Sequence, residues 1–220
     1  MLNKRQFLLG TLLLLASGWP IGSAQALPIP DDTLGAGNQT SVDLGETSND
    51  IPAYIIRGGY QYDGNIFHSF EQFNIAVDES VYFVSPKDAR AIFTRVTGGD
   101  VSNLFGTLGV DGGADLYFLN PAGVVFGPDI SLDIAGGLTV STEPSVLFQD
   151  GSIFSVDGTT DSSLLTISVP LGLPEIDYTR PVPGESSASI ITQPSADPIQ
   201  NDDADILGSL NLFADTIRLT

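Results

Sequence analysis

The sequence "ADLYFLNPAGVVFGPDISLDIAGGLTVST" (residues 114–142) is the part of the chain most informative about its architecture. Three turns, "NPAG", "GPD" and "AGG", separate its apolar runs. Apolar side chains occupy every second position, as Leu116 and Phe118 do before the first turn and Leu138 and Val140 do after the last. This alternation is typical of β-strands that bury one face. A chain that coils into a β-helix must change direction several times in each coil, and such short, frequent turns allow this. The stretch therefore favours a parallel β-helix.

The chain beyond residue 26 has the same character throughout. Short apolar runs alternate with turns, and the 24 Gly and 14 Pro residues recur too often for long helices. No apolar period of 3.6 residues is sustained over three turns. The chain is therefore predicted to be all-β. Coils of roughly 20 or more residues would place about five coils in residues 51–168.

A β-sandwich or a barrel is also compatible with the number of strands. Asp-Gly pairs favour tight hairpin turns, which these alternatives need and a parallel β-helix uses sparingly. The chain has four such pairs: Asp63-Gly64, Asp111-Gly112, Asp150-Gly151 and Asp157-Gly158.

The first residues have the composition of a secretory signal peptide. The basic pair at 4–5 precedes the apolar run "FLLGTLLLLA" at 7–16, and small residues lead to "AQA" at 24–26. A membrane span needs about 18 or more apolar residues, and the Gly and Pro residues at 18–22 interrupt the run too early. Residues 1–26 are therefore predicted to be a signal peptide that is cleaved after Ala26.

The charge and the cysteine content limit the possible partners and the stabilising bonds. The chain has 27 acidic and 8 basic residues, for a net charge of −19. Such a surface repels phosphate backbones, so nucleic acid is not expected as a partner. The chain has no Cys, so a core and hydrogen bonds must hold the exported protein together, and the unfolded chain cannot become cross-linked in an oxidising compartment.

The composition divides the chain beyond the signal peptide into three parts. Residues 27–173 carry most of the strand-like runs and are predicted to form the β-helix domain. Residues 174–205 are rich in Pro, Ser and Asp, as expected of a linker or loop. Residues 206–220 resume the strand pattern, and are expected to fold back, to begin a continuing coil or to belong to a truncated chain.

Candidate catalytic groups are few, so no enzymatic activity is predicted. The single His, His68, has no G-x-S-x-G motif to supply a nucleophile. The alternative is a β-helical enzyme that acts on polysaccharides. In that case the pairs Asp111 with Asp115 and Asp129 with Asp133 could share strand faces and provide the two carboxylates of glycoside hydrolysis. An acidic glycan would also require clustered basic residues, and those of this chain are scattered.

Two acidic loops raise the question of a metal. The sequences "VDGGAD" (110–115) and "QNDDAD" (200–205) supply oxygen ligands of the type that calcium prefers. Neither has EF-hand spacing, and a solvated acidic loop explains them as well. No cofactor is therefore expected, and a calcium-stabilised surface adhesion protein is a further alternative.

Four blocks in fixed order resemble the N-terminal domain of filamentous haemagglutinin. They are "NIFHSFEQFNI" (65–75), "IFTRVTGGDVSNLFGTL" (92–108), the stretch 114–142 and "LLTISVPLGL" (164–173). This domain is the secretion domain of two-partner secretion exoproteins, and the chain resembles the form that is common among cyanobacteria. The resemblance implies a right-handed parallel β-helix with an N-terminal cap and a small antiparallel excursion.

The resemblance also implies a function. The chain would be a non-enzymatic secreted exoprotein, or the N-terminal head of one, similar to adhesins and haemagglutinins. It would cross the outer membrane through a partner β-barrel transporter that carries periplasmic POTRA domains. Its final location would be the cell surface or the extracellular medium, where a cell-surface or glycan ligand is a further conceivable partner.

The resemblance places a secretion motif at the first turn of the stretch 114–142. The family motif Asn-Pro-Asn-Gly-Ile corresponds to Asn120, Pro121, Ala122, Gly123 and Val124. Ala replaces the second Asn, which removes a side-chain hydrogen bond but leaves a turn that Asn, Pro and Gly favour. A second family motif, Asn-Pro-Asn-Leu, is absent. The other block residues expected to matter are Phe70, Phe73, Asn74, Arg95, Gly98 and Gly99.

Overall fold

The computed structural model describes residues 27–148, 152–157, 189–193, 209–214 and 216–218. Every regular element in these residues is a β-strand. The strands form three sheets and one separate hairpin. In the described residues no helix is long and apolar enough to span a membrane. The expected signal peptide and the fourth sequence block (164–173) lie outside the described residues.

We call the three sheets A, B and C. Sheet A contains β1 (Ile29–Pro30), β4 (Tyr60–Tyr62), β5 (Asn65–Gln72), β7 (Ala91–Val96), β10 (Asp115–Leu119), β13 (Gly137–Ser141) and β17 (Ser209–Phe213). Sheet B contains β2 (Thr40–Glu46), β3 (Pro52–Gly58), β6 (Ser80–Val84), β9 (Thr107–Asp111) and β12 (Ser131–Asp133). Sheet C contains β8 (Ser102–Leu104), β11 (Val124–Phe126), β16 (Ser189–Thr192) and β18 (Thr216–Arg218), and the hairpin is β14 (Ser145–Leu147) with β15 (Ile153–Ser155).

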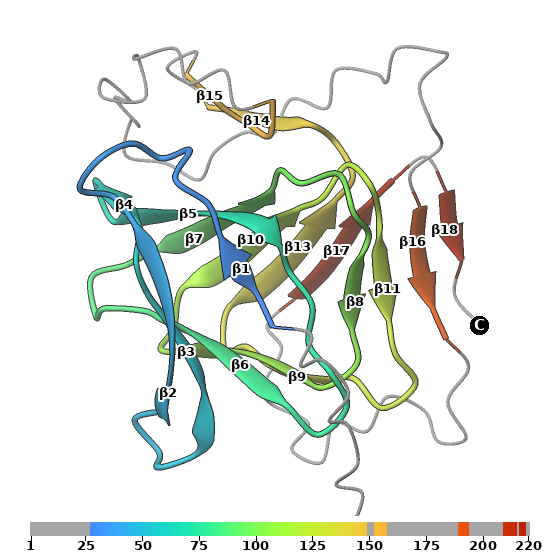
Figure 1. Cartoon of the computed structure of the whole chain (residues 1–220), viewed down its shortest axis with the longest axis horizontal. Helices are drawn as coiled ribbons and strands as arrows, with labels where there is room; N and C mark the ends of the chain where they lie inside the picture. The colour runs from blue at the N-terminus through green and yellow to red at the C-terminus, as the bar shows by residue number, and fades with distance from the viewer. Residues whose placement is uncertain (1–26, 149–151, 158–188, 194–208, 215, 219–220) are drawn as a thin grey trace, which may run out of the picture.

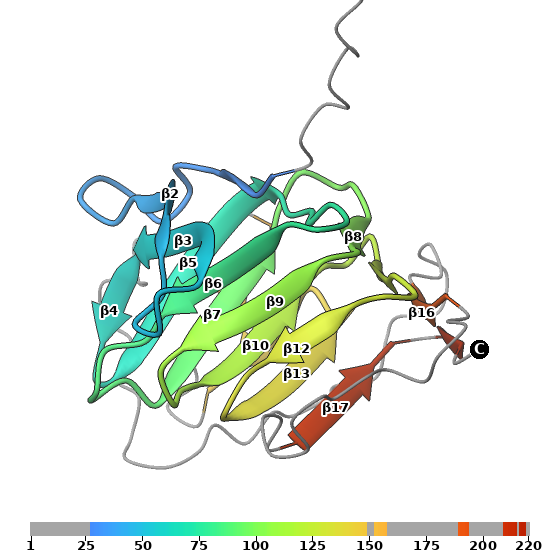
Figure 2. The ribbon, with the colours of Figure 1, turned by 90° about the horizontal axis from the view of Figure 1, so that it is seen from below.

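The chain visits sheets B, A and C in turn, and each visit adds a parallel strand beside the previous one. Asn65 pairs with Ala91, 26 residues later, and Leu116 pairs with Leu138, 22 residues later. Sheet A therefore shows its main strands in chain order from β5 to β17 (Figure 1). Figure 2 shows sheets A and B advancing together, coil after coil, along the molecule. The predicted parallel β-helix is confirmed, and the sandwich and barrel alternatives are excluded by these parallel ladders.

The interior of the β-helix contains the alternate side chains that the sequence pattern identified. Leu116 and Phe118 point inward from β10, and Leu138 and Val140 point inward from β13. Each fully buried aliphatic or aromatic side chain contributes about 1.5–3 kcal/mol to folding. The same core includes Ile56, Ile66, Phe70, Phe73, Phe83, Ile92, Leu108 and Val124.

The outer face of sheet A is also apolar and is covered. Phe67, Phe93 and Tyr117 stand in register on neighbouring strands, with ring centroids 5.3 and 4.6 Å apart. Phe148 and Phe154, from the hairpin β14–β15, pack on these rings. This hairpin is the antiparallel excursion that the family resemblance implies. At the N-terminal end of the β-helix, β1 and β4 pair antiparallel with β5, and β2 pairs antiparallel with β3. Strands β1, β2 and β4, with residues 31–34 between β1 and β2, form the N-terminal cap.

The number of coils in residues 51–168 was predicted wrongly. The described residues of this span contain four coils rather than five, because strand-to-strand steps are 22 to 27 residues and because residues 145–147 and 153–155 form the hairpin. Asp63-Gly64 does turn a hairpin, between β4 and β5, whereas Asp111-Gly112 leads onward from β9 to β10.

Strand β16 lies inside residues 174–205, the expected linker or loop, and pairs with β11. Strands β17 and β18 extend sheets A and C.

Candidate functional site

The predicted secretion motif forms the turn that leads from β10 to β11. The side-chain Oδ1 of Asn120 accepts a hydrogen bond from the backbone N of Ala122 at 2.9 Å. The backbone N of Gly123 donates to the backbone O of Asn120 at 3.0 Å, which closes the turn. Pro121 fixes the backbone between them, and Val124 begins β11 and enters the core. The corner is thus complete with Ala122 in place of the family's second Asn.

Asn120 also joins two coils through its side chain. Its Nδ2 donates to the backbone O of Asp100 at 3.0 Å and to Oγ of Ser102 at 2.8 Å. The side chain is fully buried. Both amide N–H groups and the amide oxygen are therefore occupied within the fold. In the folded domain Asn120 acts as a structural bridge, and its amide is not presented to a partner.

Two block glycines allow close approach of the backbone at this corner. A Cβ on Gly123, where φ is 115°, would lie 2.7 Å from the backbone O of Ser189. A Cβ on Gly98 would lie 2.2 Å from the backbone O of Glu71. Such separations are too short for any side chain, so both positions need glycine. Gly99 has a φ of 81° and turns the chain at the same corner.

The block residues of the first coil lie at the corresponding corner. Phe70 and Phe73 are buried and meet edge to face with centroids 5.0 Å apart. Asn74 Oδ1 accepts hydrogen bonds from the backbone N and from Nδ2 of Asn103, at 2.9 and 3.2 Å. Asn74 thus bridges the first and second coils as Asn120 bridges the second and third. The structure therefore places the family-block residues at or near one corner, between sheets A and C.

Arg95 lies at the centre of a buried polar cluster on the outer side of sheet A, and it is 1% exposed. Its Nε donates to Oγ of Ser69 at 2.9 Å, and its Nη2 donates to Oγ1 of Thr33 at 2.7 Å. These two hydroxyls lie 2.9 and 2.6 Å from the carboxylate of Asp31. Because a guanidinium only donates and a carboxylate only accepts, each hydroxyl accepts from Arg95 and donates to Asp31.

The two charges of this cluster interact through the hydroxyl groups. Thr97 Oγ1 and the backbone N of Thr33 donate two further hydrogen bonds to Asp31, at 2.7 and 2.8 Å. Burial raises the pKa of Asp31, but the hydrogen bonds outweigh it and hold the pKa below its ordinary value. Burial lowers the pKa of Arg95, and the negative charge of Asp31 opposes this change. The cluster ties the cap segment at 31–33 to β5 and β7.

Sequence patterns alone did not identify the partners of Arg95. Asp31, Thr33, Ser69 and Thr97 are ordinary polar residues in the sequence, and their partners are distant along the chain. One signal was present in "AIFTRV", where Arg95 shares the outward face of β7 with an aromatic residue, Phe93. A charged residue beside a large aromatic on an outer face indicates that another segment covers that face.

A cleft of about 420 Å³ opens at this corner. Asn120, Pro121 and Ala122 of the motif line one side of it, together with Gly99 from the preceding coil. The cap and the end of the hairpin complete the cleft through Thr33, Val156 and Asp157. The cleft therefore brings together the motif, the cap and the hairpin. Its lining has no grouping of a nucleophile with a base.

A family model of the TPS secretion domain, where TPS denotes two-partner secretion, matches residues 26–191. The matched region includes all ten block residues. The chain belongs to the TPS secretion domain family. The family inferred from the four sequence blocks is confirmed, and it is a secretion family rather than a catalytic one.

Among solved structures, this TPS domain is similar to the HMW1 secretion domain from Haemophilus influenzae. The sequence identity is 21% and the TM-score is 0.42. The alignment covers 70% of this chain and 32% of that one, so the chain spans about a third of the length of the matched structure. No curated protein matches the chain.

The single histidine of the TPS domain has a structural environment. His68 is 1% exposed and points into the core from β5. Its Nδ1 is 3.0 Å from Oγ1 of Thr40, and its ring lies 5.4 Å from that of Phe83. Burial lowers the pKa of His68 to about 3, so the ring is neutral at pH 7.

The carboxylates that a glycoside hydrolase would need do not share strand faces, so that expectation is wrong. Asp111 ends β9, where its carboxylate accepts a hydrogen bond from the backbone N of Ser48 at 2.8 Å. Asp115 begins β10, and its Oδ1 accepts from the backbone N of Gly137 at 2.7 Å. A three-residue turn separates the two strands, which belong to different sheets.

The second pair is divided in the same way. Asp129 lies in the exposed turn before β12, and Asp133 ends β12, where its Oδ2 accepts from the hydroxyl of Tyr82 at 2.7 Å. The described residues contain no group of three or more His, Cys, Asp or Glu side chains that could hold a metal ion. The acidic loop at 200–205 lies outside the described residues.

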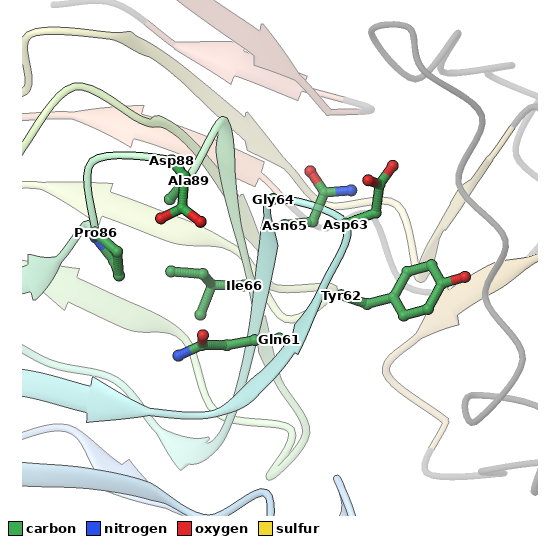
Figure 3. Close-up of a pocket in the computed structure, with 9 residues that line it drawn as sticks. All are labelled: Gln61, Tyr62, Asp63, Gly64, Asn65, Ile66, Pro86, Asp88 and Ala89. Carbon is green, nitrogen blue, oxygen red and sulfur yellow. The ribbon is translucent and has the colours of Figure 1, made fainter.

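A second cleft, of about 210 Å³, lies where the hairpin β4–β5 faces the loop before β7 (Figure 3). Arg90 Nη2 binds the carboxylate of Asp63 at 3.0 Å and so fixes the turn of the hairpin. Figure 3 shows Asp88 and Gln61 on opposite sides of Ile66, with the side chain of Asn65 directed away from Gln61 and beside that of Asp63. Asn65 is 5% exposed. This cleft can offer amide and carboxylate groups to a small polar ligand.

Proposed function

We propose that the chain is the export-directing part of a two-partner secretion exoprotein. In this proposal residues 1–26 direct the chain to the periplasm, and residues 27–173 are then recognised by an outer-membrane β-barrel transporter with POTRA domains. The protein folds after passage, at the cell surface or in the medium. The observation that carries the proposal is the family match over residues 26–191, which includes the motif corner.

The architecture is compatible with passage of an extended chain. The chain has no Cys, so no disulfide can block a narrow pore. Each coil pairs mainly with its two neighbours. Ala91, for example, pairs with Asn65 of the preceding coil and with Asp115 of the following coil. A solenoid with nearest-neighbour contacts can form coil by coil as the chain emerges.

The placement of the motif side chains favours recognition before folding. Asn120 uses its whole amide inside the folded corner, so a transporter that reads this Asn must meet it in the unfolded chain. An extended segment offers unpaired backbone groups to which a POTRA sheet can add a strand. In the folded domain the edge strand β2, which pairs with β3 alone among described strands, offers a second such edge.

The export proposal is tested by producing the full chain with and without a co-expressed partner transporter. The chain should accumulate in the medium when the transporter is present and remain in the periplasm when it is absent. A matched control carries only residues 1–26 fused to a periplasmic reporter, and it should stay in the periplasm in both strains. Equal amounts of the full chain in the medium of both strains would refute the proposal.

An adhesive role is the second candidate function. The cleft beside β4 and β5 favours it, because its lining combines the amides of Gln61 and Asn65 with the carboxylates of Asp63 and Asp88. Such groups can bind the hydroxyls of an uncharged sugar. The purified protein should bind neutral glycans on an array, and Asn65→Ala should abolish the binding. An array without signal for the parent protein would eliminate this candidate.

A further inference from the structure

Arg95 also contacts the hairpin that covers sheet A. Its Nη1 donates a hydrogen bond to the backbone O of Ser155, and its guanidinium carbon lies 4.9 Å from the ring centroid of Phe154. One side chain therefore contacts β5 through Ser69, the cap through Thr33, and the hairpin through residues 154 and 155. The cap and hairpin contacts lie 62 and 60 residues from Arg95, on opposite sides along the chain.

The buried position of Arg95 makes these contacts depend on one another. A guanidinium has five N–H donors and no way to lose its charge. When it is buried, removal of one set of partners leaves a charged group without hydrogen bonds in an apolar surrounding. If the hairpin leaves, water must reach Arg95, and the hydroxyls that link it to Asp31 are then exposed as well. If the cap leaves, the hairpin loses its guanidinium partner in the same way.

We propose that Arg95 makes closure of the N-terminal cap conditional on docking of the β14–β15 hairpin. The coils up to β13 can then form while the cap is open and the outer face of sheet A is uncovered. The domain closes in one step, when residues 31–33 and residues 154–155 engage Arg95 together. Under the proposed export function, this step would keep the first coils unlocked until most of the TPS domain had emerged, and that consequence rests on the proposed function.

The cap and the hairpin can also be coupled by apolar packing, which has to be distinguished from coupling through Arg95. Leu34 of the cap and Phe148 and Phe154 of the hairpin belong to one buried cluster. Loss of Phe154 could therefore loosen the cap through packing alone. A double-mutant cycle distinguishes the routes, because only coupling through the guanidinium disappears when Arg95 is replaced.

The test measures amide hydrogen exchange by mass spectrometry on the purified full chain. Phe154→Ala should accelerate exchange in residues 29–34 at least tenfold, although it changes only the hairpin. In an Arg95→Met background the cap should already exchange rapidly, and adding Phe154→Ala should change its rate less than twofold. The control Val125→Ala, on the outer side of sheet C, should leave exchange in the cap unchanged.

A milder variant keeps the test decisive if Arg95→Met fails to fold. Coupling is reciprocal, so Thr33→Val, which removes only the cap-side hydroxyl, should accelerate exchange in residues 152–156 by several-fold. The proposal is overturned if Phe154→Ala accelerates cap exchange equally with and without Arg95, or if neither segment responds to a change in the other. These measurements need no transporter, so their outcome is independent of the export proposal.

Discussion

Asn120 shows most clearly what the motif contributes. Its local turn was predictable from the sequence, because Asn, Pro and Gly each favour a specific backbone geometry. Its bonds to Asp100 and Ser102 were not predictable, since they depend on the coil length that stacks one corner on the next. The same reason hid the cluster around Arg95. Local chemistry identifies a turn, whereas the partners across coils follow from the register.

Asn120→Ala should destabilise the folded domain. The substitution leaves the backbone O of Asp100, Oγ of Ser102 and the backbone N of Ala122 without their partner. Three lost hydrogen bonds should lower the free energy of unfolding by about 2 to 4 kcal/mol. Urea denaturation followed by circular dichroism measures the change.

The matched control is Ala122→Asn, which restores the family residue at a half-buried position two residues away. It should alter the free energy of unfolding by less than about 0.5 kcal/mol. A neutral Asn120→Ala variant would show that this corner does not depend on the amide.

His68 should make the stability depend on pH. Burial lowers its pKa to about 3 in the folded state, whereas an unfolded chain has a His pKa of about 6.5. Below pH 6.5 the unfolded state therefore binds more protons, and stability falls as the pH decreases toward 3. At pH 4.5 this effect should cost about 2 to 3 kcal/mol relative to pH 7.

The measurement compares urea unfolding of the parent and of His68→Gln at pH 7 and 4.5. The variant keeps every other ionisable group of the parent, so contributions other than that of His68 cancel in the comparison. The parent should lose about 2 to 3 kcal/mol more than the variant on acidification. Equal losses would mean that His68 is accessible to protons in the folded state.

At the scale of the elements, the sequence predicted the coil strands, but it did not predict which segment covers the outer face of sheet A. The alternation in residues 114–142 identified the inward side chains of β10 and β13. The outward row of Phe67, Phe93 and Tyr117 had no predicted cover, because the residues of β14 and β15 have the same alternation as coil strands. Strand β16 was missed for the opposite reason, since its four residues lie in a stretch rich in Pro, Ser and Asp.

Sheet B contains a cross-strand brace that can be tested. Tyr82 of β6 pairs with Gly109 of β9, and its hydroxyl reaches Asp133 of β12 at 2.7 Å. A Cβ on Gly109 would lie 2.2 Å from the Tyr82 ring, so the ring lies directly over this glycine. Gly109→Ala should therefore displace the ring and lower the free energy of unfolding by about 2 to 3 kcal/mol.

In a Tyr82→Ala background the same Gly109→Ala change should cost less than about 0.5 kcal/mol, because the clash no longer exists. Urea denaturation of the four proteins completes the cycle. Additive costs would contradict the brace and would point to an unfavourable backbone conformation at Gly109 as the cause.

At the scale of the whole molecule, the class and topology followed from the sequence, and the number of coils did not. The parallel β-helix was inferred from alternation, short turns and the four ordered blocks. Coil length had to be assumed, and the corner turns with their coil-to-coil bonds make each coil longer than the assumed minimum. Residues 145–147 and 153–155 then form the hairpin instead of coil strands. Periodicity defines a strand but carries no information about how much chain lies between strands.

The excess of acidic residues should make the folded protein sensitive to salt. The net charge is −19, and the described residues contain a single ion pair, between the exposed side chains of Arg90 and Asp63. Self-repulsion therefore opposes the compact state. Between about 10 mM and 0.15 M salt the screening length falls from about 30 to 8 Å, so Tm at pH 7 should rise by about 3 °C or more. The control is the same pair of measurements near the isoelectric point of about 4.1, where the repulsion is small and the rise should disappear. An equal rise at both pH values would assign the effect to general ion exclusion from the surface rather than to charge.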